Sequence, residues 1–174
     1  MKKEIILNKL NENHKSFIDY LSNLAKKEFE LSVHKKWTAG QQLEHIVLCV
    51  KGLVLFFSLD KAAIEQDFGS TSRQGRSYEA LLREYTDNSG GGWKAPVRYI
   101  PETNTINKRE NLIETLEGLI KELGFKIETF TERELDSLQI PHPTLGMLTL
   151  REMLYNAIYH VEHHLLIVQC DLKK

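Results

Sequence analysis

Residues 149–171 read TLREMLYNAIYHVEHHLLIVQCD, and this segment carries the clearest structural signal in the chain. It opens with Thr149 and Glu152, the capping-box pattern in which each side chain hydrogen-bonds the other residue's backbone N–H. No proline interrupts the segment, and its apolar residues recur every three or four positions, which predicts one long amphipathic helix. The apolar face consists of Leu150, Leu154, Ile158, Val161 and Leu165. A helix with one apolar face needs neighbouring helices to cover it.

Three other proline-free segments show the same helical periodicity and are long enough to provide those neighbours. The expected long helices are residues 3–29, 38–66 and 105–130, and shorter helical pieces are expected over 77–87 and from 131. Thr38 and Gln41 repeat the capping-box pattern at the start of the second long helix. Four long helices predict an all-α fold, a four-helix bundle with short additional helical turns and long loops, in one domain spanning residues 1–174.

Prolines and glycines mark the long connections between these helices. Pro96 and Pro101 bracket residues 97–100, whose alternation is the strongest of the weak strand signals. A run of three glycines, residues 90–92, lacks the preceding strand and the GK[ST] ending of a phosphate-binding loop, so it is expected to be a connector. The next residue, Trp93, is expected to pack in the core or lie exposed, with a place beside a substrate pocket as the alternative.

The charge balance is nearly neutral, because 23 Lys plus Arg face 24 Asp plus Glu. Binding of nucleic acid through a basic face needs clustered Lys and Arg, so no nucleic-acid partner is expected. The most apolar run, residues 46–59, is interrupted by Lys51 and is shorter than the roughly 20 residues of a membrane span. The N-terminal segment lacks the apolar stretch of a signal peptide, and Cys49 and Cys170 make no disulfide framework. A cytoplasmic protein with no membrane partner is therefore predicted.

Seven histidines are the unusual feature of the composition, and three of them lie on the last predicted helix. At about 100° per residue, His160 and His164 fall close together at the edge of the apolar face, whereas His163 turns away. Two imidazoles one turn apart can chelate a divalent ion. The same spacing also suits two partly buried histidines that hydrogen-bond neighbouring helices, and spacing alone does not separate these interpretations.

A third histidine strengthens the metal interpretation. His45 lies at the edge of the apolar face of the second long helix, with Gly52 on its own side, where a small residue would leave room beside a ligand. Three imidazoles and an open fourth position are the composition of a catalytic zinc or nickel site. We therefore predict that His45, His160 and His164 bind one divalent metal ion.

The remaining histidines and the first cysteine are expected to have plainer roles. His14 and His34 are expected on the surface. His142 lies between two prolines and is expected to be a loop residue, with a place in a cleft as the alternative. Cys49, one turn after the first predicted ligand, is expected to be a small core residue, with a thiol near the site as the alternative.

Three motifs, in a specific order and spacing, cover most of the chain. They are WTAGQQLEHI (residues 37–46), the loop from KAP to the next proline (94–101), and PTLGMLTLRE running into HVEHH (143–152 and 160–164). Together they resemble the DinB/YfiT-like superfamily of metal-dependent enzymes. The resemblance implies a four-helix bundle with the metal held by His45, His160 and His164, an active-site mouth built from loops, and often a homodimer. Members of known activity include S-transferases that use low-molecular-weight thiols, hydrolases and isomerases.

A metal-dependent transferase or hydrolase is therefore the predicted function, with a small-molecule substrate and a low-molecular-weight thiol as the candidate partner. A bound ion lowers the pKa of water for hydrolysis or holds a substrate thiol as thiolate for transfer, and the three ligands do not choose between these reactions. Glu44 and Glu162 do not share the histidine side of their helices, so no general base is predicted. The alternative function is a non-catalytic bundle that binds a small molecule or a protein, with structural histidines.

Overall fold

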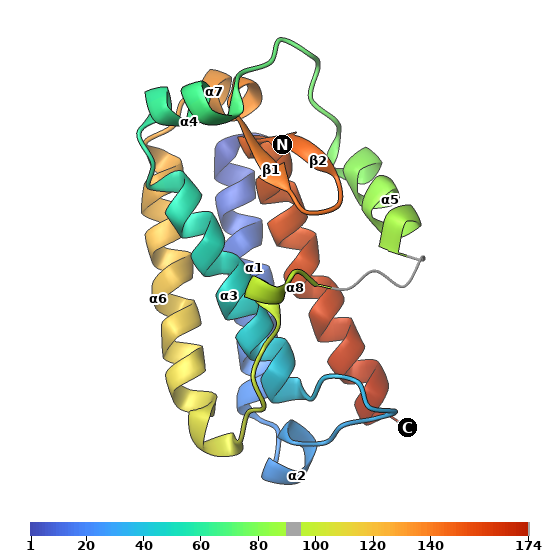
Figure 1. The fold of residues 1–174 in the computed structure, drawn as a ribbon. Helices are drawn as coiled ribbons and strands as arrows, with labels where there is room; N and C mark the ends of the chain where they lie inside the picture. Colours follow the sequence, from blue (N-terminus) through green and yellow to red (C-terminus); the bar gives the residue numbers. More distant parts are fainter. Residues whose placement is uncertain (90–94, 174) are drawn as a thin grey trace.

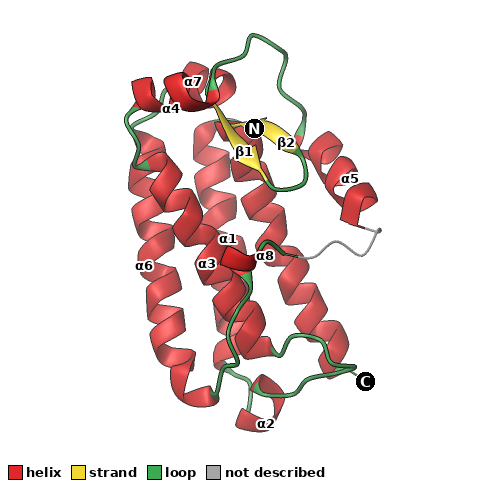
Figure 2. Ribbon diagram, in the orientation of Figure 1, coloured by secondary structure: helices red, strands yellow, loops and turns green. Residues whose placement is uncertain are grey.

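Four long helices run side by side along the molecule and form a four-helix bundle (Figures 1 and 2). The structure, a computed structural model, describes residues 1–89 and 95–173. The long helices are α1 (Lys3–Ser22), α3 (Ala39–Phe57), α6 (Arg109–Glu128) and α8 (Leu150–Leu172). Each packs against two others, in the order α1, α6, α3, α8 and back to α1, so their apolar faces enclose one core. The predicted all-α four-helix bundle is confirmed.

Two of the long helices begin at the capping residues that the sequence indicates. The Thr38 hydroxyl accepts a hydrogen bond from the N–H of Gln41 at 3.1 Å, and the Gln41 side-chain oxygen accepts from the N–H of Thr38 at 3.0 Å. The same reciprocal pair joins Thr149 and Glu152 at the start of α8. Each pair satisfies backbone N–H groups that a helix N-terminus would leave without partners. Both capping-box predictions are confirmed.

The core contains large apolar side chains from all four long helices. Fully buried examples are Phe17, Leu43, Ile46, Leu116, Leu123 and Leu154. Among the described residues, α3 is the one helix that is long and apolar enough to cross a membrane, and 50% of it is buried inside the bundle. A core helix of a bundle can pass the same test, because its neighbours cover its apolar face.

Shorter elements close the two ends of the bundle and flank its side. They are α2 (Lys26–Phe29), α4 (Lys61–Phe68), α5 (Tyr78–Ser89), α7 (Glu132–Ser137), the 3₁₀ turns η1 (Val97–Tyr99) and η2 (Ile106–Lys108), and the strands β1 (Gln139–His142) and β2 (Gly146–Thr149). The two strands pair antiparallel, with Ile140 opposite Leu148, and lead directly into α8. In Figure 1, α5 lies outside the bundle next to α8, and the hairpin sits near the end that also carries α4 and α7.

Two predicted helices are shorter in the structure than in the prediction. The segment 3–29 is not one helix, because α1 ends at Ser22 and α2 starts again at Lys26. The segment 38–66 breaks after Phe57, because the Asp60 side chain accepts a hydrogen bond from the N–H of Ala62 and caps a new helix, α4. An aspartate that satisfies a first-turn N–H favours a new helix start over continuation of the old helix.

One loop prediction changes. Residues 97–100 form no strand, in line with the weakness of the signal, and 97–99 make the turn η1 between flanking loop residues. The predicted loop 141–146 is instead largely the β1–β2 hairpin, in which Gly146 adopts a φ of +69°. Glycine adopts this left-handed conformation without the steric penalty that other residues meet. The three-glycine run 90–92, with Trp93, lies outside the described residues.

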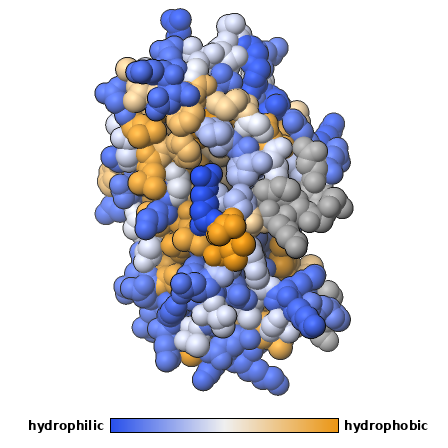
Figure 3. All heavy atoms as spheres, in the orientation of Figure 1, coloured by the Kyte–Doolittle hydropathy of each residue, from blue (hydrophilic) through white to orange (hydrophobic). Residues whose placement is uncertain are grey.

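Apolar side chains gather over α3 on the face shown in Figure 3, among polar side chains of the surrounding elements. Leu55 is 63% exposed and Leu59, just after α3, is 40% exposed, and both border a shallow hollow with Arg98. Arg98 lies close by, with its guanidinium carbon 4.8 Å from the centre of the Tyr99 ring. Both residues belong to η1, so this contact lies within the turn, and the hydrogen bond from His45 to the Tyr99 carbonyl joins η1 to α3.

Replacement of Gly40 by Ala should destabilise the protein, although Ala is the better helix former. A Cβ atom at Gly40 would lie 2.6 Å from Cε1 of Phe29, whose side chain is fully buried. We expect the free energy of unfolding to fall by about 1–3 kcal/mol, the usual cost of overpacking a core. Gly118→Ala is the matched control, because nothing lies within 4 Å of that Cβ and the change should stabilise by about 0.5–1 kcal/mol. Urea denaturation of both variants checks the opposite signs, and equal shifts would contradict the packing argument.

Candidate metal centre

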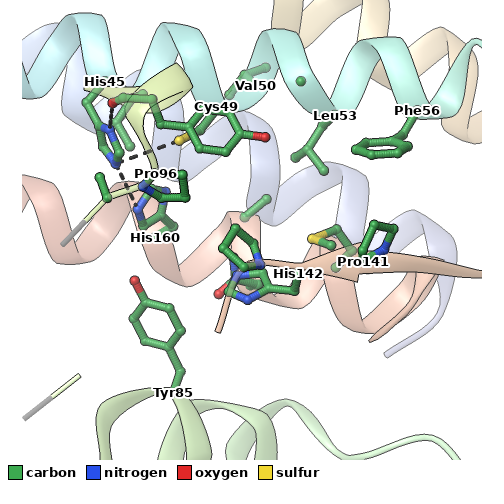
Figure 4. Close-up of a pocket in the computed structure, with 18 of the residues that line it drawn as sticks. His45, Cys49, Val50, Leu53, Phe56, Tyr85, Pro96, Pro141, His142 and His160 are labelled. Atoms are coloured by element: carbon green, nitrogen blue, oxygen red, sulfur yellow. Dashed lines mark hydrogen bonds between the residues drawn. The ribbon is translucent and has the colours of Figure 1, made fainter. Parts of the chain in front are cut away.

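Three histidines from two facing helices converge in the interior of the bundle. His45 comes from α3, and His160 and His164 come from α8. The Nε2 atom of His160 lies 3.3 Å from Nε2 of His45 and 3.0 Å from Nε2 of His164. One ligand nitrogen from each ring lies within 4.8 Å of the other two. Figure 4 shows the rings of His45 and His160 turned toward each other across the gap between the helices.

Hydrogen bonds at the far side of two rings fix which nitrogens carry hydrogen. The Nδ1 atom of His45 donates to the backbone oxygen of Tyr99 at 2.6 Å, and Nδ1 of His164 donates to Oε1 of Gln42. Because an oxygen of this kind only accepts, both Nδ1 atoms carry hydrogen and both Nε2 atoms present lone pairs. His160 has one hydrogen at most to offer at Nε2, so it satisfies at most one of the two lone pairs.

This donor set fits a divalent cation. Zinc binds imidazole nitrogen at about 2.0–2.1 Å in tetrahedral geometry, which separates two ligand nitrogens by about 3.3–3.4 Å. The observed Nε2 separations of 3.3 and 3.0 Å are close to that value. The partners of the opposite nitrogens, a backbone carbonyl and a side-chain amide, are of the kind that orients metal-binding histidines in proteins.

All three rings are neutral at neutral pH, the form that binds metal. Burial lowers the pKa of His45, although its hydrogen bond to Tyr99 acts in the opposite direction. Burial, together with the charge that neighbouring histidines would carry, lowers the pKa of His160 and of His164 well below the usual value. Protons therefore compete weakly with a metal ion for these nitrogens.

Neighbouring aromatic side chains hold the His45 ring in place. The Trp37 ring lies 5.0 Å from it, measured between ring centres. The Tyr99 ring lies over Gly52, where an added Cβ would come within 3.0 Å of the Tyr99 hydroxyl oxygen. The Tyr99 ring thus occupies the space that the sequence predicts beside Gly52. In this position the backbone carbonyl of Tyr99 reaches His45.

A cavity of about 90 Å³ opens beside the three histidines (Figure 4). His45 and His160 form part of its wall. Most of the wall is apolar, and its members include Val50, Leu53, Phe56, Pro96, Pro141 and Met153. Among the described residues no Asp or Glu lines it. Glu44 instead accepts hydrogen bonds from Asn104 and from the N–H of Glu102.

The structure corrects the prediction for His14. Its side chain is 2% exposed and lines the cavity, whereas a surface position was predicted. The signal was present in the sequence, because His14 follows Leu10 by four positions and precedes Phe17 by three on the apolar face of α1. Burial lowers the pKa of His14 to about 4, against a smaller opposite effect of its hydrogen bond to Leu10. A neutral histidine can occupy a core position that a charged one could not.

The structure also places the other histidines and Cys49 for which the sequence predicts a position. His142 lines the cavity, so the cleft alternative is the correct one. His34 is exposed, as predicted. His163 is not one of the converging histidines, and its ring stacks on Tyr159 and meets the edge of the His164 ring. Cys49 also lines the cavity, with its sulfur 3.7 Å from Nε2 of His45, and burial raises the pKa of its thiol to about 12. Cys49 is therefore a neutral thiol near the site and not simply a core residue.

The fold and the histidine cluster define a class, namely helical bundles with a three-histidine centre that could hold a metal ion. The sequence profile of the DinB superfamily matches residues 9–168, and the chain belongs to this superfamily. The crystal structure of an uncharacterized protein from Clostridium difficile 630 is similar, with a TM-score of 0.60 and 12% sequence identity. The alignment covers 99% of this chain and 96% of that chain, and at this identity it shows a shared fold alone. No curated protein matches the sequence.

Replacement of Gln42 by Leu should weaken metal binding without removing a ligand. Gln42 is 3% exposed, and its side-chain oxygen accepts the Nδ1 hydrogen of His164. Leucine leaves this buried N–H without a partner and frees the ring to rotate, so affinity should fall by about 10–100-fold. Competition with a chromophoric zinc chelator measures the change. The exposed Gln66→Leu on α4 is the control, and an unchanged affinity in Gln42→Leu would contradict an orienting role.

Proposed function

We propose that this protein is a metal-dependent enzyme in which His45, His160 and His164 hold one divalent ion, zinc or nickel. The observation that carries the proposal is the convergence of neutral imidazole nitrogens, two with fixed lone pairs, beside a cavity. In a purely structural role His160 could donate to only one of the other two Nε2 atoms, and Nε2 of His45 would have the weak S–H donor of Cys49 as its other partner. When bound, such an ion supplies Lewis-acid chemistry that lowers the pKa of a thiol or a water.

Among reactions of this kind, S-transfer from a small thiol to an electrophile fits the cavity best. Hydrolytic sites of the HExxH kind pair their metal ligands with a glutamate that acts as general base. No described residue of the cavity wall is a carboxylate. A thiol whose pKa has fallen below neutral needs no such base, and apolar walls favour its attack by excluding water. Hydrolysis is the second candidate reaction.

The chain's own residues have clear tasks under this proposal. Tyr99 and Gln42 hold the rings of His45 and His164 through the Nδ1 hydrogens. Trp37 packs beside the His45 ring. The apolar wall, including Val50 and Leu53, binds the body of the substrate and excludes water.

The test combines metal uptake with thiol binding. Cobalt(II)-loaded protein is titrated with 2-mercaptoethanol and followed by absorption spectroscopy. A thiolate-to-cobalt charge-transfer band should develop with the wild type and be absent with His45→Ala. Zinc- and nickel-loaded protein is then assayed with a panel of small thiols and 1-chloro-2,4-dinitrobenzene. Lack of stoichiometric metal in the wild type would overturn the proposal, and metal-dependent cleavage of 4-nitrophenyl acetate without a thiol effect would favour hydrolysis.

The non-catalytic alternative predicts a different outcome. A bundle that only binds a small molecule or a protein would be stabilised by its ligand but would show no turnover with any thiol and electrophile. Its histidine variants would lose stability without loss of a reaction. The homodimer and the cytoplasmic location stay predictions, and sedimentation equilibrium checks the first.

A further inference from the structure

Two histidines of the cavity wall are not part of the three-histidine cluster. His14 lies on α1 and His142 lies at the end of β1, so they reach the cavity from different elements. Both stand close enough to His160 that their charge would lower its pKa. Neither ring is a proposed metal ligand. The ring nitrogens of His14 and His142 can therefore hydrogen-bond a molecule that enters the cavity.

The hairpin fixes the tautomer of His142. Its Nδ1 atom accepts hydrogen bonds from the backbone N–H of Thr144 and of Leu145, each at 3.2 Å. A backbone N–H only donates, so Nδ1 carries no hydrogen in this arrangement. The hydrogen of the neutral ring is therefore on Nε2, on the side away from the turn. His142 presents a hydrogen-bond donor.

Helix α1 fixes the opposite tautomer in His14. Its Nδ1 atom donates to the backbone oxygen of Leu10 at 2.8 Å. The hydrogen of the ring is therefore on Nδ1, and Nε2, on the side away from the α1 backbone, carries a lone pair. Because the ring is 2% exposed and borders the cavity, this lone pair is a buried acceptor beside the cavity.

The cavity wall contains no charged side chain among the described residues, and the charge of Arg98, which acts on the Cys49 thiol, lies outside the wall. No Asp, Glu, Lys or Arg of residues 1–89 and 95–173 lines the cavity. Burial lowers the pKa of His142 and that of His14 to about 4, so both rings are neutral at neutral pH. A charged group that entered the cavity away from the metal would lose its hydration and gain no ionic partner.

We propose that the cavity binds the uncharged part of the substrate, a compact apolar body with a carboxamide-like group that accepts a hydrogen bond from Nε2 of His142 and donates one to Nε2 of His14. The apolar body contacts the wall formed by residues such as Leu53 and Phe56. The volume of about 90 Å³ is smaller than the cavity of about 150 Å³ that holds benzene, so the enclosed part has about four to six heavy atoms. The inference rests on the proposed function in assigning this ligand as the substrate of the metal centre.

Three small probes that differ in charge test whether the cavity accepts a charged group. Isobutyramide, isobutyrate and isobutylamine have the same branched apolar body, and saturation-transfer NMR measures their binding to the full-length protein with zinc and after removal of metal by a chelator. Metal-free protein should bind isobutyramide at least about tenfold more tightly than either charged probe, as expected for two hydrogen bonds and no ionic partner. Equal or tighter binding of a charged probe to metal-free protein, or no binding of isobutyramide, would overturn the inference.

Paired variants assign the two hydrogen bonds. The amide of Asn reproduces the Nδ1 side of a histidine, so His14→Asn and His142→Asn keep the local bonds to Leu10 and to Thr144 but lack Nε2. Each should weaken isobutyramide binding by about three- to tenfold. His34→Asn, at an exposed position, is the control and should leave binding unchanged. Thermal denaturation confirms that each variant is folded.

A fourth probe keeps the test decisive if one variant fails to fold. The ketone 3-methylbutan-2-one has the shape of isobutyramide but accepts without donating. It should bind more weakly than the amide, respond to His142→Asn and not respond to His14→Asn. Loss of ketone binding in a folded His14→Asn equal to the loss of amide binding would overturn the assignment. Because all of these measurements use metal-free protein, the inferred ligand site and the proposed metal function can fail separately.

Discussion

Replacement of His160 by Ala should lower zinc affinity by more than about 100-fold, beyond the effect of losing a group that merely orients a ligand. His160 lies between the other two rings, with its Nε2 atom 3.3 Å from His45 and 3.0 Å from His164. Its loss leaves two nitrogens that do not enclose an ion. Isothermal titration with zinc measures the affinity, and thermal denaturation with and without zinc should show that the metal-dependent rise in Tm is lost.

The control for this prediction lies on the same helix. His163 is not among the three converging histidines, since its ring stacks on Tyr159 and meets the edge of the His164 ring with 5.5 Å between ring centres, so His163→Ala should retain zinc binding close to that of the wild type. Equal losses in the two variants would mean that zinc binds at the surface and not at the three-histidine centre. Retained binding in His160→Ala would reject the ligand assignment directly.

Replacement of Glu152 by Gln should cause the largest loss of stability, about 2–4 kcal/mol in the free energy of unfolding, since breaking one side of a buried ion pair leaves the other charge unmatched. The Glu152 side chain is 1% exposed and accepts hydrogen bonds from the Arg73 guanidinium and from the N–H of Arg76 and of Thr149. These bonds tie the segment before α5 to the start of α8. Glutamine keeps the shape of the side chain but removes its charge. Because Arg73 is 34% exposed, water screens the pair, and the expected loss in the free energy of unfolding is smaller than for a fully buried pair.

The Glu152 carboxylate should also make the free energy of unfolding depend on pH in the acidic range. Burial by itself would raise the pKa of Glu152, but the hydrogen bonds from Arg73, Arg76 and Thr149 and the Arg73 charge lower it to about 2. A lowered pKa means that the contribution is complete above the unfolded value of about 4.5 and is lost as pH falls from there through about 2. Urea denaturation across this range should show a steeper loss in the wild type than in Glu152→Gln. The exposed Glu162→Gln on α8 should follow the wild type, and identical pH profiles of wild type and Glu152→Gln would contradict the argument.

The sequence predicts the bundle well because local physics determines most of it. Periodic apolar residues show which face each helix buries, and the pairs Thr38–Gln41 and Thr149–Glu152 mark helix starts within four residues. The hairpin is missed because each strand has only four residues, too few for a period of two to be recognised, and Pro141 lies inside one of them. The break at Asp60 is missed because apolar residues resume at Ala62 and Ile64, although an aspartate favours a helix start over a helix interior.

The centre is only partly predictable for a different reason. His45, His160 and His164 share helix edges, so spacing along each helix selects them. The contacts that orient them come from distant positions, as in the pair His45 and Tyr99 separated by 54 residues. His14 is missed because histidine is usually treated as polar, while burial favours its neutral form.

The carbonyl of Tyr99 has a consequence for how this site would look in a mutational survey. His45 is oriented by a main-chain oxygen, which every amino acid carries. An alanine scan would therefore leave that hydrogen bond in place and would report only the separate loss of the Tyr99 ring over Gly52. Divergent sequences could likewise change the side chain at this position and keep the contact, provided that the turn η1 holds its path. The contact depends on the course of the chain, which a comparison of residue identities would not detect.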